Sequence, residues 1–81
     1  QPGKTMKKSE FLKIAILASG NSVPASITTA PFRDVGTDAW FAPYYDFAKQ
    51  HGIVRSKTDV FPLQEITRGE AAEILYRLNQ L

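Results

Sequence analysis

The chain of 81 residues contains no cysteine, one histidine and one tryptophan. Without cysteine it forms no disulfide and offers no thiolate to a metal, and a single histidine leaves too few nitrogen ligands for a conventional zinc site. Catalysis finds little support in the sequence, since there is no cysteine nucleophile, no glycine-rich phosphate loop and no histidine with a serine or aspartate partner in its sequence context. We therefore expect no metal, no cofactor and no enzyme activity.

Long hydrophobic runs are absent too. The densest apolar stretch, residues 11–18, is interrupted by Lys13 and is much shorter than the roughly 20 residues that a bilayer span needs. The amino end shows no basic segment followed by an apolar one, which would be typical of a signal peptide. We expect no membrane span, and in this respect a mature secreted fragment and a cytoplasmic protein look alike.

What the chain does contain is typical of one small globular domain. Hydrophobic residues make up 43% and charged residues 22%, which separates the chain from disordered and low-complexity sequences. The net charge of +2 is uneven, because residues 1–30 carry four lysines against one glutamate. Such lysines lie on a solvated helix face or meet a polyanion. Nucleic acid is not expected, because no aromatic residues are interleaved with them.

Apolar periodicity and turn residues predict three helices. The first covers residues 9–18, is apolar on nearly every side and should be buried on most of its surface, and Gly20 ends it. Residues 22–31, rich in serine, threonine, alanine and proline, form an extended linker. The second helix begins at Asp38, a good N-cap, or a residue or two later, and ends just before Gly52.

The third helix has the clearest start signal in the sequence. Residues 67–70, Thr-Arg-Gly-Glu, have the form of a capping box, in which the threonine hydroxyl and the glutamate carboxylate each accept from an otherwise unpaired backbone N–H. An apolar stripe follows, and Glu73 and Arg77 are four residues apart, as in an exposed ion pair.

A shift of sixty residues aligns the beginning of the chain with its end. The aligned identities include Pro2 with Pro62 and Glu10 with Glu70. Residues 1–21 therefore look like the second half of a unit whose complete copy is residues 32–81, with residues 22–31 as the linker between them. The predicted fold is all-α, a small helical bundle of helix-loop-helix repeats with extended linkers.

Five separated elements follow one another in the order of a known motif. They are Phe32-Arg-Asp-Val35, Trp40, Ala42-Pro-Tyr-Tyr45 with Ala48-Lys-Gln-His-Gly-Ile-Val54, Phe61, and Ile66-Thr-Arg-Gly-Glu70. In this order residues 32–79 resemble the S-layer homology motif, and residues 2–20 resemble the carboxyl-terminal half of another. The resemblance implies a helix-loop-helix repeat, normally used in threes around a pseudo-threefold bundle.

The resemblance also implies a function. Members of the family are extracytoplasmic and anchor surface proteins, without covalent linkage, to anionic polymers of the bacterial cell wall. The chain is then expected to be a non-catalytic module at the cell wall or cell surface of a bacterium, and its partner an anionic cell-wall polysaccharide, a secondary cell wall polymer associated with peptidoglycan.

Five residues are the candidates for ligand binding. Arg68 matches the family's basic residue associated with the acidic sugar, and an arginine at the first position of a capped helix suits a carboxylate. Lys8 occupies the corresponding place in the amino-terminal half but lacks the two-pronged geometry of arginine. Trp40 either stacks on a sugar or anchors the core, which is the commoner role. Asp34 caps a turn or pairs with a basic residue, and Lys57 supplies further charge.

One segment departs from the family pattern and keeps a second function open. Residues 55–62 form a loop that is shorter than usual and lacks the glycine of the family's ligand groove. The alternative is a protein-interaction or self-assembly domain that keeps the helices without the groove. Because the first helix needs neighbours, and two chains amount to three motif equivalents, we also expect a homodimer, or completion by further S-layer homology motifs.

Overall fold

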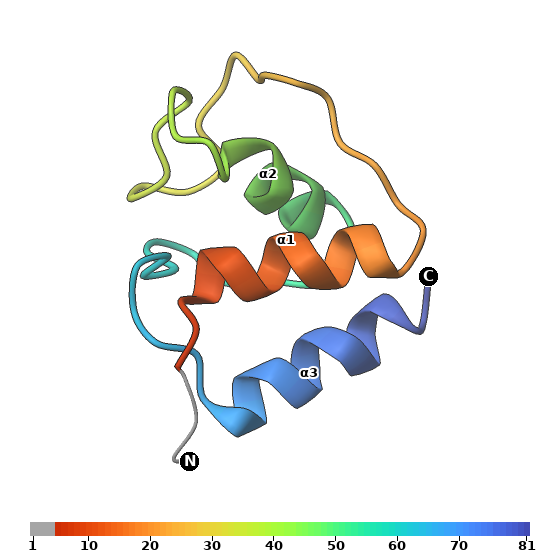
Figure 1. Cartoon of the computed structure of the whole chain (residues 1–81). Coiled ribbons are helices and arrows are strands. Elements are labelled where there is room, and N and C mark those ends of the chain that lie inside the picture. The colour runs from red at the N-terminus through yellow and green to blue at the C-terminus, as the bar shows by residue number, and fades with distance from the viewer. Residues whose placement is uncertain (1–4) are drawn as a thin grey trace.

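Three helices account for the regular structure of residues 5–81, the part of the chain that this computed structural model describes (Figure 1). They are α1 (Lys8–Ala18), α2 (Ala42–Gln50) and α3 (Arg68–Leu78). No strand forms within residues 5–81, where β-pairing is limited to two isolated bridges. The all-α prediction is confirmed. Pro2 and Lys4, which belong to the repeat and to the basic amino end, lie outside the described residues.

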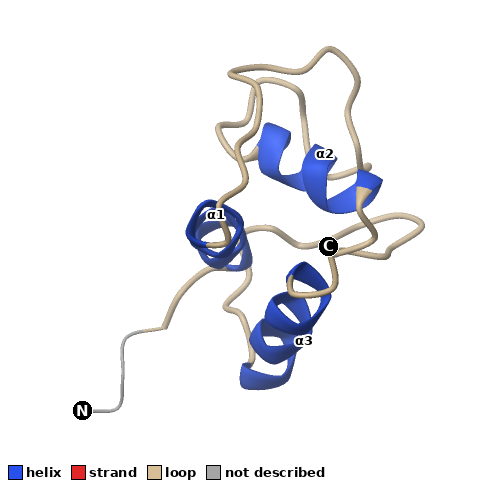
Figure 2. Ribbon diagram, turned by 90° about the vertical axis from the view of Figure 1, so that its right-hand side faces the viewer, coloured by secondary structure: helices blue, strands red, loops and turns tan. Residues whose placement is uncertain are grey.

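Helix α1 packs against both of the other helices, whereas the backbones of α2 and α3 do not approach each other closely. Figure 2 looks nearly along α1 and shows α2 and α3 on different sides of it. On α1, Leu12 and Ile16 are 1% and 0% exposed, and from α2 Tyr45 and Ala48 are buried against the same core. None of these helices is long and apolar enough to cross a membrane.

Turn residues end the helices where the sequence predicts. Gly20 and Gly52 have φ values of 88° and 69°, in the left-handed region that glycine enters without a steric penalty. The N–H of Ile53 then donates back to the Ala48 carbonyl at 2.8 Å, which closes the end of α2. Ile53 is fully buried, so the turn after α2 also contributes to the core.

The start of α2 is later than predicted. Asp38 is not its N-cap, because the backbone first makes two successive turns, with hydrogen bonds from Ala39 to Gly36 and from Ala42 to Ala39. Helix α2 begins only at Ala42, so that Pro43 falls in the first turn, where its missing N–H costs nothing. The prediction used both Asp38 as a cap and the tolerance of Pro43 in the first turn, and the structure follows the second, with the proline closer to the start than expected.

The sixty-residue shift relates α1 and α3 residue by residue. Both helices have 11 residues, and in both a glutamate at the third position accepts from the N–H of the capping residue, Glu10 from Lys7 at 3.0 Å and Glu70 from Thr67 at 2.8 Å. The second bond of the capping box forms only on α3, where the Glu70 N–H donates to the Thr67 hydroxyl at 3.1 Å. Lys7 cannot accept the equivalent bond on α1, because a lysine side chain has no acceptor.

The segments that lead into α1 and α3 cross each other as an antiparallel bridge between Lys7 and Glu65. Two backbone bonds hold it, from Lys8 to Gln64 and from Ile66 to Met6, each 2.8 Å long. The bridge ties the starts of the two helices together, although they are far apart in the sequence.

The linker of residues 22–31 contains no regular structure, as predicted, and runs from the end of α1 across to the α2 side of the molecule (Figure 1). It is nonetheless attached to the core, because Val23 and Ile27 are partly buried against it. The Lys49 ammonium group donates to the Pro31 carbonyl at 3.0 Å, which holds the end of the linker beside α2.

One prediction about α1 is wrong. The helix is not buried on most of its surface, since Ile14 and Leu17 are 54% and 45% exposed. The face that carries Leu12 and Ile16 is covered, while the opposite apolar face has no cover within residues 5–81.

The unequal caps of α1 and α3 predict opposite effects of two matched substitutions. Thr67→Ala removes the hydroxyl that accepts from Glu70 and should lower the free energy of unfolding by about 1 kcal/mol. Lys7→Thr should raise it by about 0.5–1 kcal/mol, because Lys7 already has the extended backbone of a cap. Urea unfolding followed by circular dichroism measures both. Equal effects of the same sign would contradict this assignment.

Candidate functional site

A cavity of about 220 Å³ lies where α2 and α3 diverge from α1. Its walls combine apolar side chains with three basic and three acidic residues, so no single charge dominates it. The charged lining residues are Lys8, Arg55, Arg77, Asp59, Glu70 and Glu73. Tyr45 lies in the wall contributed by α2, and its burial raises the pKa of its hydroxyl above the ordinary range, so the phenol is neutral near pH 7.

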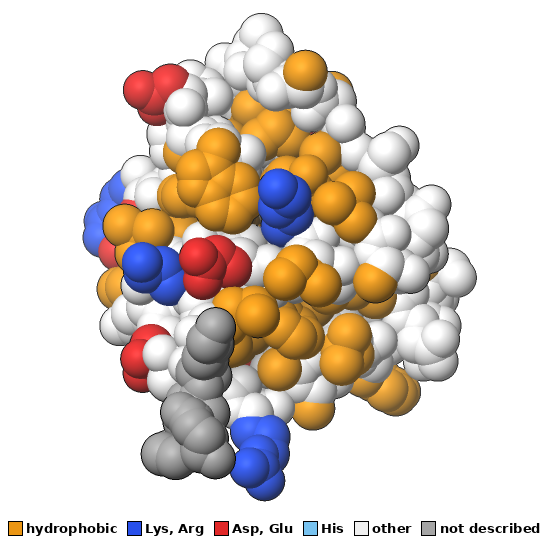
Figure 3. Space-filling view, viewed as in Figure 1, with side chains coloured by type: hydrophobic (Ala, Val, Ile, Leu, Met, Phe, Trp, Pro, Cys, Tyr) orange, Lys and Arg blue, Asp and Glu red, His pale blue; other side chains and the backbone are white. Residues whose placement is uncertain are grey.

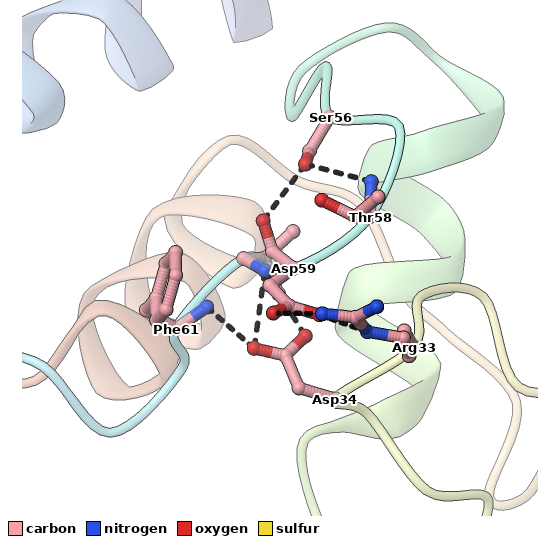
Figure 4. Close-up of polar contacts among 7 residues, drawn as sticks. Arg33, Asp34, Ser56, Thr58, Asp59 and Phe61 are labelled. Carbon is pink, nitrogen blue, oxygen red and sulfur yellow. Dashed lines mark hydrogen bonds and ion pairs between the residues drawn. The ribbon is translucent and has the colours of Figure 1, made fainter.

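The loop of residues 55–62, on one side of this cavity, is held by two residues of the segment before α2, Arg33 and Asp34 (Figure 4). Asp34 accepts from the N–H groups of Val60 and Phe61, at 3.0 and 2.8 Å. Arg33 makes a two-pronged ion pair with Asp59, both bonds 2.9 Å long, which raises the pKa of the guanidinium. Of the two roles predicted for Asp34, the capping role is the one observed.

Phe61 is the one non-glycine residue with a positive φ within residues 5–81, at 53°. A side chain in this left-handed region costs roughly 1–2 kcal/mol, and the bond from its N–H to Asp34 offsets part of that cost. The ring is half-exposed at the edge of the cavity, with the Lys8 ammonium 5.7 Å from its centre. The loop of residues 55–62 contains no glycine. In the structure, Phe61 of this loop adopts a backbone conformation that glycine usually adopts.

Lys8 is already paired. Its ammonium group lies 3.0 Å from a carboxylate oxygen of Glu70, and its side chain is mostly buried. The pKa of Glu70 lies below its ordinary value, chiefly because its carboxylate accepts from the Thr67 N–H, with further help from Lys8. The charge of Lys8 is therefore largely matched within the protein, and little of it is available to an outside anion.

Arg68 is in a different situation at the first position of α3. It is exposed, and within residues 5–81 its side chain makes no hydrogen bond or ion pair, whereas Arg33 and Arg77 are each paired with an acid. Space around Gly69 is open, since a Cβ placed there would meet nothing within 4 Å. An anion can therefore reach both the guanidinium and the first turn of the helix.

The starts of α1 and α3 differ in their backbone as well. On α1 the N–H groups of Lys8 and Ser9 donate to the carbonyls of Gln64 and Pro62. The equivalent N–H groups of Arg68 and Gly69 have no acceptor in the described part of the chain. Unpaired donors at a helix start attract anions, because the positive end of the helix dipole adds to their charge. Of the two related helix starts, that of α3 is the open one.

Trp40 is 54% exposed, so it is not a core anchor. Its ring meets those of Phe41 and Tyr44 edge to face, with centres 5.3 and 6.5 Å apart, and the Lys13 ammonium lies 5.5 Å from its own centre. Phe41 occupies the core position instead. The result is a firmly held, half-exposed aromatic surface beside a lysine that sequence reasoning did not include among the candidates.

The structure does not gather the five candidates into one place. Lys8 and Asp34 both contact Phe61, but Arg68, Trp40 and Lys57 do not line the same cavity. Lys57 is exposed beside a second, shallow hollow of about 360 Å³. Sequence reasoning missed Tyr45, Phe61 and Arg77 as cavity residues, and no local signal marks them, because tertiary packing brings them together.

Comparisons with known proteins do not add to this description. No protein-family model matches the chain, and no significantly similar protein was found among the curated proteins or the solved structures. No group of three or more side chains suited to a metal ion occurs within residues 5–81. A functional proposal therefore depends on the residues themselves.

The lowered pKa of Glu70 predicts a stability that depends on pH. Its ionised carboxylate favours the folded state, so this contribution is present above the unfolded pKa of about 4.5 and is lost as pH falls through the lower folded value. Glu70→Gln should be less stable than the wild type at pH 7, and the difference should shrink on acidification. Urea midpoints across pH measure it, with Glu65→Gln as the control. A difference that stays constant down to about pH 2 would contradict the assignment.

The loop anchor predicts unequal effects of two aspartate substitutions. Asp34→Ala removes the acceptor for two loop N–H groups and should lower the free energy of unfolding by about 1–2 kcal/mol, the lower part of the range for charged acceptors because the site is exposed. Asp38→Ala should change it by less than about 0.5 kcal/mol, since Asp38 accepts no hydrogen bond within residues 5–81. Urea unfolding followed by Trp40 fluorescence makes the comparison. Equal losses would remove Asp34 as the anchor.

Proposed function

We propose that the chain is a non-catalytic binding module that holds a surface protein on an anionic cell-wall polysaccharide of a bacterium. The observation that carries the proposal is the open start of α3. There an arginine without an acidic partner in residues 5–81 stands beside two N–H groups without an acceptor. Carboxylate or phosphate groups of a polymer match such a set of donors, because arginine binds them with two parallel bonds.

The half-exposed Trp40 supports the same class of ligand. Sugar rings have apolar faces that stack on aromatic side chains, and Lys13 provides a positive charge within reach of the same surface. Lys57 adds a second exposed charge. Lys8 and Asp34, in contrast, are used within the protein, so in this proposal they position the Phe61 loop instead of contacting the polymer. The proposed site is thus led by Arg68, with Trp40 and Lys57 as outlying contacts.

A second function is supported by a different observation. Several large apolar side chains of α1 and α3 are exposed, among them Ile14, Leu17 and Leu75. Exposed apolar side chains that lie together are typical of protein interfaces. The alternative is therefore a protein-interaction or assembly domain, and the two functions are compatible because Arg68 and the apolar residues occupy different positions on α3.

Arg68 predicts the outcome of a binding experiment. The protein should sediment with purified cell-wall sacculi that carry their anionic polymer and stay in solution with sacculi stripped of it. Arg68→Ala should weaken retention by at least about tenfold, the effect of losing charge-assisted bonds. Arg68→Lys should fall between the two, because lysine keeps the charge without the two-pronged geometry.

The matched control is Lys7→Ala. It removes one positive charge at the related start of α1, where the side chain makes no hydrogen bond within residues 5–81. Its retention should stay close to that of the wild type. Equal loss in both variants would indicate a general charge effect, and unchanged retention of Arg68→Ala would remove the arginine from the site.

A further inference from the structure

Helices α1 and α3 are related by the sixty-residue shift, yet they bury opposite faces. Positions buried on α1 are exposed at the same place on α3, and positions exposed on α1 are covered on α3. The first group consists of the pairs Ser9/Gly69, Leu12/Ala72, Ala15/Leu75 and Ile16/Tyr76. The second consists of Ile14/Ile74, Leu17/Arg77 and Ala18/Leu78. Each helix therefore leaves open the face that its counterpart covers.

The two open faces join into one surface, which we call the α1–α3 face and define by Ile14, Leu17, Ala18, Leu75 and Leu81. Ala18, Leu75 and Leu81 line a single groove of about 430 Å³ between the carboxyl ends of the helices. Figure 3 shows hydrophobic side chains gathered on this side of the molecule, over α1 and α3. Among residues 5–81 no charged residue lines the groove, so an apolar partner can enter it without stripping water from a charge there.

We propose that the α1–α3 face is the interface of a homodimer, in which α1 of one copy packs on α3 of the other. Inside one chain α1 packs on α3 through the face that carries Leu12 and Ile16, and the open face of α3 has the equivalent positions, with the roles of the two helices exchanged. A two-fold axis through the α1–α3 face places α1 of the first copy on α3 of the second. The same axis places α3 of the first copy on α1 of the second. Such an interface is self-complementary and closed, as is usual for dimers.

The helix inventory favours this arrangement over the completion of three motifs. The α2 helix is buried against α1 in its own chain, so a second copy has no spare α2 to offer. What two copies do bring together is four helices of the α1 and α3 type, enough for a four-helix layer with an α2 on each outer side. The dimer forms without opening either chain.

This inference is independent of the proposed polysaccharide binding. Arg68 is exposed at the amino end of α3, whereas the groove lies at the carboxyl end, and the test below uses no polymer. A failure of one therefore leaves the other standing.

Molar mass in solution tests the proposal. Sedimentation equilibrium from about 1 μM to about 1 mM should show the mass rising from 9.0 kDa to twice that value. Leu17→Glu and Leu75→Lys should each weaken dimerisation by at least about tenfold, because each places a charge in an apolar interface. The double variant should regain dimerisation, since the new glutamate on α1 meets the new lysine on α3 of the other copy.

The controls separate the interface from the fold. Both positions are exposed, so circular dichroism should show unchanged helix content, and Leu63→Glu, exposed on the loop before α3, should dimerise like the wild type. A mass of 9.0 kDa at every concentration would overturn the dimer. Single variants that dimerise like the wild type would also overturn it. A mass above that of two copies would do so too, because it indicates head-to-tail contacts and not a closed dimer. If the double variant stays monomeric, α1 does not pack on α3 of the other copy.

Discussion

The burial of one face of α1 is the constraint on which the rest of the structure depends. Leu12 and Ile16 are buried on α1, the helix against which both of the others pack, while the link between α3 and the turn after α2 is a single polar one, from Arg77 to the Ile53 carbonyl. Without α1, helix α2 would keep only loops as neighbours, and α3 would lose the helix that covers Ile74 and Leu78. Burial of a large aliphatic side chain contributes about 1.5–3 kcal/mol, and a chain of this size has few such side chains to lose.

The divergence of α2 and α3 creates the cavity, and polar anchors keep its loop in place. Asp34 and Arg33 reach across 26 residues of sequence to hold the loop that ends at Phe61. These bonds use side chains that would otherwise be available to a ligand, as does the ion pair of Lys8 with Glu70. Among the basic residues without an acidic partner in residues 5–81, Arg55 lines the cavity, whereas Arg68 at the start of α3 and Lys13 beside Trp40 lie outside it.

Helices α1 and α3 share one sequence pattern but have different surroundings, so their starts and their exposed faces differ. The same helix pattern occurs twice, with the same length and the same glutamate at the third position, but the two copies meet different neighbours. One has its first N–H groups covered by loop carbonyls and its charge paired, and the other is open at the same points. The two helix starts correspond in position but differ in their caps, and the surrounding chain covers the start of α1 and leaves that of α3 open within residues 5–81.

The sequence by itself determined what depends on a few neighbouring residues. It predicted three helices, the capping box at Thr67 and Glu70, and the left-handed turns at Gly20 and Gly52, because caps and turns act within about four residues. Only the tertiary structure decided which face of each helix is buried, that Trp40 is exposed, and that Lys8 is paired while Arg68 has no partner within residues 5–81. Those outcomes depend on contacts between distant segments. An apolar stripe shows that a helix has a face to bury, but not whether another part of the same chain will cover it.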